Sequence, residues 1–141
     1  MAVDRWNPAS FWSLDGVPMH HAVAVHDGVT IHLSGQVGWD SKNNLIGPGD
    51  VRAQTEKTFD NIEVILGSVG GVLDDLVSLT YYYVNPSDVA AIREVRAKRL
   101  SAEHGPASAG IRCAGLILPE LLVEIVSIAV VPRDRYRPPN Q

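Results

Sequence analysis

Hydrophobic and polar positions follow two regular patterns along the chain, and these patterns divide it into seven elements. Runs rich in Val, Ile, Leu and Tyr, bounded by Gly, Pro, Asn or Asp, predict strands over residues 21–25, 29–37, 76–84, 107–116 and 121–131. Apolar residues at helical spacing predict two helices, over about 50–66 and 88–100. The predicted order is ββαβαββ, preceded by an arm without periodicity over residues 1–19 and followed by a polar tail over 132–141.

The first two predicted strands are separated by an Asp27-Gly28 step. Both residues tolerate a positive φ, so the step predicts a β-hairpin. The whole pattern indicates the α/β (α+β) class, with one mixed sheet and two helices packed on one of its faces.

The last predicted strand carries apolar side chains on both of its faces. Alternation places one set on the first face (Leu121, Val123, Ile125, Ala129, Val131) and a second set on the other (Leu122, Val126, Ile128, Val130). Two helices cover only one face of a sheet, and a bare apolar patch of this size is rare on a monomer. We therefore expect the chain to associate with copies of itself in a closed, symmetric oligomer.

Composition narrows the class further. The 141 residues are 45% hydrophobic and 20% charged, which is typical of one globular domain spanning 1–141. The formal net charge of −4 argues against a nucleic-acid partner, and no apolar run is long enough to cross a bilayer. A single cysteine, Cys113, excludes an intrachain disulfide, and the first residues do not resemble a signal peptide. We expect a cytoplasmic protein without a membrane partner.

Glu124 is the strongest candidate for chemistry. Alternation places it between Leu122 and Val126 on an apolar strand face. An ionised carboxylate is costly there unless it is paired, and burial favours its neutral form, which suits a general acid or base near neutral pH. The alternative is a structural glutamate that binds a neighbouring backbone or an arginine.

The remaining polar residues give weaker signals. Ser34-Gly35 interrupts the second strand, where a missing side chain permits close approach of a ligand or simply a bulge. His20 and His21 face opposite ways, no Cys/His spacing fits a metal, and no glycine-rich loop precedes a helix. The sequence therefore predicts no metal and no cofactor.

Taken together, the motifs resemble those of the Rid family, the YjgF-like reactive-intermediate deaminases. The matching pieces keep their order over roughly 21–131: Ala24-Val25, Gly28, Ser34-Gly35-Gln36, Gln54 to Leu66 with Asn61-Ile62, Tyr82-Tyr83-Val84, Pro106-Ala107 and Leu122-Val123-Glu124-Ile125. The resemblance implies a chorismate-mutase-like fold, a homotrimer, and a small-molecule cleft at each subunit interface. It assigns to Glu124 the positioning of the water that hydrolyses an enamine or imine. It implies a cleft lined by His21, Ser34, Gly35, Tyr83, Ser108, Gly110 and Arg112.

The sequence departs from the family pattern at the substrate-binding cation. The family arginine that binds the substrate carboxylate corresponds to Ser108, and the residue two positions later is Gly110. Strand alternation puts 108, 110 and 112 on one face, so Arg112 is a candidate replacement, with Arg93 on the second helix as another. For both arginines the alternative is an exposed or ion-paired side chain.

Two functions from different classes follow. The first is an enzyme that hydrolyses a small enamine, imine or related C–N compound, with Glu124 handling water. The second is a non-catalytic protein that binds a small metabolite. A ribonuclease agrees poorly with the negative charge and with the absence of a paired acid and base.

Overall fold

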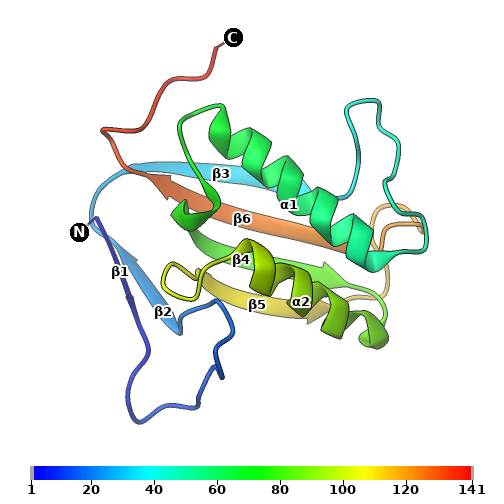
Figure 1. Cartoon of the computed structure of the whole chain (residues 1–141), viewed down its shortest axis with the longest axis horizontal. Coiled ribbons are helices and arrows are strands. Elements are labelled where there is room, and N and C mark those ends of the chain that lie inside the picture. The colour runs from blue at the N-terminus through cyan, green and yellow to red at the C-terminus, as the bar shows by residue number, and fades with distance from the viewer. Residues whose placement is uncertain (1, 141) are drawn as a thin grey trace.

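The computed structural model describes residues 2–140 and contains two helices and six strands (Figure 1). In chain order they are β1 Val3–Trp6, β2 Ala22–Val25, β3 Val29–Gln36, α1 Val51–Gly67, β4 Leu76–Tyr83, α2 Val89–Arg99, β5 Ala107–Arg112 and β6 Val123–Val131. Short 3-10 turns precede β4, at Leu73–Asp75, and α2, at Pro86–Asp88. The predicted α+β class is confirmed.

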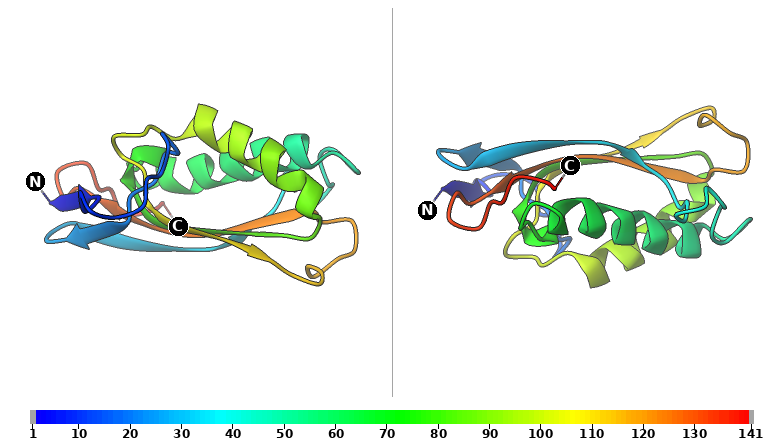
Figure 2. Two further views of the ribbon diagram at one scale, coloured as in Figure 1. Left: turned by 90° about the horizontal axis from the view of Figure 1, so that it is seen from below. Right: turned by 90° about the horizontal axis from the view of Figure 1, so that it is seen from above.

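Four strands form a mixed sheet in the order β3-β6-β4-β5. The strand β6 is antiparallel to both of its neighbours, whereas β4 and β5 are parallel and are connected through α2. Both helices lie on one face of this sheet, as the two edge-on views show (Figure 2). No helix of residues 2–140 lies on the other face.

The core lies between the sheet and the helices. It contains Phe59, Ile62 and Leu66 from α1, with Ile92 and Val95 from α2. The sheet contributes the alternate residues of β6, including Val123, Ile125 and Ala129. The predicted division of the last strand into two faces is therefore correct, and the helices cover the face of Val123.

The predicted hairpin between the first two strands is wrong. The strand β2 pairs with β1, which lies in the segment expected to be an arm without periodicity, and the two form a separate two-stranded antiparallel sheet. Gly28, at a φ of 127°, then leads the chain into β3 and packs against Val130. The Asp27-Gly28 signal was therefore a real turn, but it joins two sheets rather than two paired strands.

The last two strands are shorter than predicted, because residues 113–122 form a connecting loop. The side chain of Gln54, buried on α1, fixes this loop. Its amide nitrogen donates to the Glu120 carbonyl at 3.2 Å, and its oxygen accepts from the Leu122 N–H at 3.0 Å. The loop enters β6 at a fixed position, and this places Glu124.

The tail beyond Pro132 is held by an ion pair. Arg135 donates to both carboxylate oxygens of Asp75, and the Arg137 N–H donates to the Val69 carbonyl. Asp75 is buried and also accepts from the Val72 N–H at 2.8 Å. Within residues 2–140, no helix is long and apolar enough to cross a membrane.

Candidate functional site

Glu124 lies on the sheet face that carries no helix. Its neighbours along β6, Val123 and Ile125, point into the core, so its own side chain points the other way. In the β4–β6 ladder it stands opposite Tyr82. Val126, the next residue but one, is 38% exposed on an apolar strand.

The carboxylate of Glu124 lies against Gly35. A Cβ at position 35 would stand 2.7 Å from Glu124 Oε2, closer than two such atoms approach in proteins. The register of β3 against β6 shifts between Leu33 and Gln36, and this irregularity carries Ser34 and Gly35. The sequence left two explanations for Gly35, a bulge or close approach by another group, and the structure contains both.

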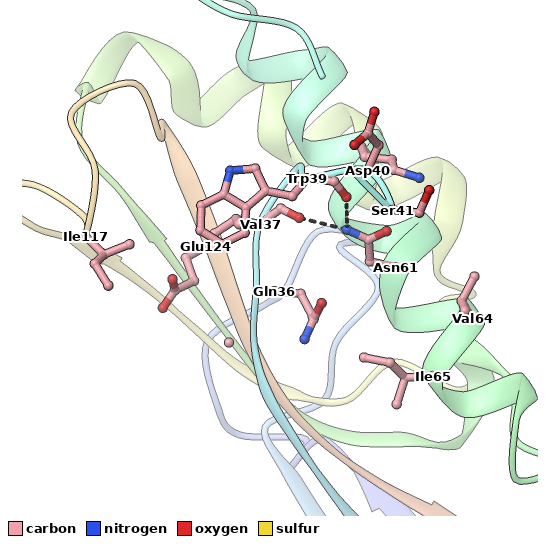
Figure 3. Close-up of a pocket in the computed structure, with 12 residues that line it drawn as sticks. Gln36, Val37, Trp39, Asp40, Ser41, Asn61, Val64, Ile65, Ile117 and Glu124 are labelled. Carbon is pink, nitrogen blue, oxygen red and sulfur yellow. Dashed lines mark hydrogen bonds between the residues drawn. The ribbon is translucent and has the colours of Figure 1, made fainter. Parts of the chain in front are cut away.

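A pocket of about 650 Å³ opens beside this contact (Figure 3). It lies along the edge of the sheet, between the end of β3, the loop that follows it and the outer side of α1. Its wall is mixed: apolar groups alternate with amides, a hydroxyl and charges. The lining residues are Gly35, Gln36, Val37, Trp39, Asp40, Ser41, Lys57, Asn61, Val64, Ile65, Ile117 and Glu124.

Glu124 is only half-buried, contrary to the expectation of an enclosed glutamate. The reason is that, in the part of the chain that the structure describes, no helix covers its face of the sheet. Among residues 2–140 no ion pair engages its carboxylate. The carboxylate is therefore available to a ligand or a water molecule in the pocket.

Asn61 shapes the far wall of the pocket. Its amide nitrogen donates to the carbonyls of Val37 and Trp39, both at 2.9 Å (Figure 3). Gly38 lies between them, where a Cβ would stand 3.1 Å from the backbone of Gln54. These contacts hold the loop against α1 and present the Trp39 side chain to the pocket. The Asn61-Ile62 motif was the available sequence signal, but nothing in the sequence pointed to Trp39 or Lys57.

Four of the residues expected in the cleft lie on the opposite face of the sheet from Glu124. The β4–β5 ladder pairs Leu79 with Ser108, Tyr81 with Gly110 and Tyr83 with Arg112, and these rows follow the helix-covered face. Gly110 makes room for the Tyr81 ring, which a Cβ would overlap. Tyr83 packs against the core, 5.9 Å from Tyr81 between ring centres. Within one subunit, Tyr82 stands opposite Glu124 and Tyr83 stands opposite Val123.

Neither candidate arginine lines the Glu124 pocket. Arg112 donates a long bond, 3.5 Å, to the Val84 carbonyl and lines a separate hollow with Asn85 and Cys113. Arg93 lies exposed on α2. Arg112 and Glu124 nevertheless lie at the same end of the sheet, because both pair with the last residues of β4.

His21 directly precedes β2, in the separate two-stranded sheet, and does not line the Glu124 pocket. Its ring meets those of Phe11 and Trp12 edge-on, at 4.6 and 4.3 Å between centres. Its Nε2 donates to the Trp12 carbonyl at 2.8 Å. Within one subunit His21 therefore belongs to an exposed aromatic cluster in the N-terminal segment.

The described residues 2–140 contain no cluster of three or more His, Cys, Asp or Glu side chains suited to a metal ion. Cys113 donates weakly to the Tyr83 carbonyl at 3.5 Å. The chemistry available at the pocket is thus that of two carboxylates, one amine, amides, a hydroxyl and an indole.

This chain is similar to known proteins in sequence and in structure. The family model described as Endoribonuclease L-PSP matches residues 17–131. A Rid-family protein of unknown function from Yersinia pestis is 32% identical, with a TM-score of 0.83, and the match covers 93% of this chain and 100% of that one. RidA from an Antarctic Psychrobacter is 34% identical, with a TM-score of 0.67 and coverage of 84% and 97%. Rv2704 of Mycobacterium tuberculosis, of the YjgF/YER057c/UK114 family, is 28% identical, with a TM-score of 0.64 and coverage of 92% and 99%.

Proposed function

Because this chain belongs to the endoribonuclease L-PSP family, which includes the Rid and YjgF proteins, we propose that it hydrolyses a small enamine, imine or related C–N compound. Glu124 positions the water. The observation that carries the proposal is the half-buried Glu124 carboxylate, which lies against Gly35 at the edge of a pocket and has no ion-pair partner within residues 2–140.

The chemistry requires a group that orients water and takes up its proton. The water oxygen bonds to the carbon of the C=N bond while Glu124 accepts a proton from the water and passes it to the nitrogen, which gives a carbinolamine. Glu124 then accepts the hydroxyl proton of the carbinolamine and delivers it to the nitrogen. The C–N bond breaks as the C=O bond forms, which leaves a carbonyl compound, ammonia or an amine, and the restored carboxylate.

We propose that the working unit is a homotrimer with clefts between subunits. The helix-free face carries exposed Val126 and half-buried Ile128, and burying such a face would favour association. Gly35 and Glu124 meet on that face, and Ser34 precedes Gly35 in the irregular part of β3. The other face carries Tyr83, Ser108, Gly110 and Arg112. A ligand that touches both sets must therefore lie where the last residues of β4 pair with Arg112 and Glu124. We propose that a neighbouring subunit closes this end of the sheet and contributes His21.

A non-catalytic metabolite-binding protein is the second candidate. It is favoured by Ser108, which stands where the family resemblance implies a substrate-binding arginine. A small ligand that carries no carboxylate would then suit the pocket. The ribonuclease activity in the name of the matching family agrees poorly with a formal net charge of −4.

The test separates the two candidates with one substitution. Freshly generated imines and enamines, charged and neutral, are offered to the wild type and to Glu124→Gln, and release of ammonia is followed. An enzyme loses turnover in Glu124→Gln but still binds the substrate analogue, since the amide keeps the shape of the carboxyl group. Glu103→Gln makes the same substitution at an exposed carboxylate outside the pocket, serves as the matched control and should retain turnover. Equal rates in the wild type and Glu124→Gln would contradict the proposal.

A further inference from the structure

A second site lies on the helix side of the molecule, at Arg96 on α2. Arg96 is only 4% exposed, although its guanidinium remains charged under all ordinary conditions. The single hydrogen bond it makes within residues 2–140 is from Nη2 to the Pro18 carbonyl at 3.3 Å. Its Nε is buried without a partner. A buried charge with so few partners is costly unless something compensates it.

No carboxylate of the described chain supplies that compensation. Arg96 takes part in no ion pair among residues 2–140. Burial, the largest influence, lowers the pKa of Arg96, while the nearby Tyr81 raises it and Arg93 lowers it. The guanidinium therefore lies in a place that favours an additional negative group.

A pocket of about 280 Å³ adjoins this arginine. It lies between α2 and the N-terminal segment at residues 15–18, and both Arg93 and Arg96 line it. The two arginines are three positions apart on the helix, so they project from the same side. The size suits an anion of a few heavy atoms rather than a large metabolite.

Two carboxylates also line this pocket, and they differ in their state. Glu94 Oε2 forms an ion pair with Arg52 Nη2 at 2.7 Å, so the charge of Glu94 is largely compensated. Asp15 takes part in no ion pair within residues 2–140. Its backbone has a φ of 51°. Asp15 therefore opposes an incoming anion, while Arg93 and Arg96 favour it.

We propose that this pocket is a binding site for a small oxyanion, held by the guanidinium of Arg96 with Arg93 at the rim. A phosphate or carboxylate group accepts paired hydrogen bonds from a guanidinium, and its charge compensates the buried cation. Because Arg96 also holds the Pro18 carbonyl, a bound anion would fasten residues 15–18 against α2. The site is separate from the Glu124 pocket and does not depend on the function proposed for it.

The test titrates the full-length protein with inorganic phosphate, and separately with acetate, at constant ionic strength balanced with chloride. Calorimetry gives the dissociation constant, and the ¹⁵N–¹H signal of Arg96 Nε reports the site directly. We expect saturable binding of at least one of the two anions, with a shift of that signal. Arg96→Met should weaken binding roughly tenfold or more, since a charge-assisted contact is lost.

Two further variants keep the result interpretable. Asp15→Asn should tighten binding, because it removes the opposing charge from a position where asparagine tolerates the same backbone. Lys98→Gln removes one positive charge, as Arg96→Met does, but from an exposed part of α2, and it should leave binding unchanged. If Arg96→Met does not fold, Arg96→Lys and the wild-type Nε signal decide the matter.

Absence of saturable binding of both anions to the wild type would overturn the proposal. So would equal binding by wild type and the Arg96 variants, or an effect of Asp15→Asn no different from that of Lys98→Gln. Arg96 would then serve only to anchor the N-terminal segment.

Discussion

The carboxylate of Glu124 occupies the space that a side chain at Gly35 would fill. A Cβ there would stand 2.7 Å from Oε2, and Gly35 has an ordinary negative or extended φ that other residues adopt. Gly35→Ala should therefore fold, with a loss of stability of about 1 kcal/mol or less, because the end of a flexible glutamate can move. The displaced carboxylate should no longer orient water, so turnover should fall roughly tenfold or more.

Steady-state rates and chemical unfolding of Gly35→Ala measure these two effects. The double variant with Glu124→Gln is the control, because the alanine should cost almost no further activity once the carboxylate is gone. Additive losses of activity in the double variant would mean that Gly35 acts on the ligand rather than through Glu124.

Imines that carry a carboxylate should be poor substrates. Ser108 stands where the family resemblance implies an arginine, and its hydroxyl is buried without a partner on the helix-covered side. Losing a charge-assisted contact costs about 1.5–3 kcal/mol, or roughly one to two decades of rate. Coupled assays with imines of 2-amino acids should give rates lower by this factor than assays with neutral imines of similar size. Equal rates for both classes would indicate that another cation serves this role.

Self-association should depend on the helix-free face of the sheet. Val126 is 38% exposed there, and Val126→Asp would bury an unpaired charge in the proposed trimer. Light scattering should give a trimer mass for the wild type and a smaller mass for this variant. Ala90→Asp adds the same charge to an exposed position of α2 and should leave the mass unchanged. A stable monomer mass for the wild type would contradict the prediction.

The tail should contribute to stability through Arg135. The side chain of its partner Asp75 is 8% exposed and that of Arg135 is 40% exposed. Arg135→Met leaves a buried carboxylate without its cation, and we expect the free energy of unfolding to fall by about 2–3 kcal/mol, less than for a fully buried pair. Arg133→Met removes the exposed pair with Asp27 and should have a much smaller effect in the same denaturant titration. Equal losses from both variants would mean that the tail acts through its general charge.

Much of the fold was predictable because its elements have strong local patterns. The helices α1 and α2 carry apolar residues at helical spacing, and the alternation in β6 correctly separated the faces of Val123 and Glu124. The short strand β1 carries no comparable signal, because Val3–Trp6 is stabilised by pairing with β2 rather than by its own pattern. For the same reason the sequence predicts a hairpin at Gly28, where the structure has a turn between two sheets.

The candidate site was predictable only in part. Glu124 and Gly35 stood out because each is unusual for its strand. Trp39 enters the pocket through contacts of Asn61 and Gly38 with distant backbone, and such contacts leave no periodic signal. The face of Arg112 depends on the register of β5 against β4, and β5 (Ala107–Arg112) carries too weak an apolar pattern to fix that register.

The position of β6 in the sheet also bears on how the chain is made. This strand is the last to emerge during synthesis, yet it pairs with both β3 and β4 and fills the centre of the sheet. Until Val131 has left the ribosome, β3 lacks its partner in the sheet and the apolar edge of β4 stays open. The four-stranded sheet can therefore close only after β6 has been synthesised, and until then the nascent chain exposes unpaired strand edges that favour aggregation.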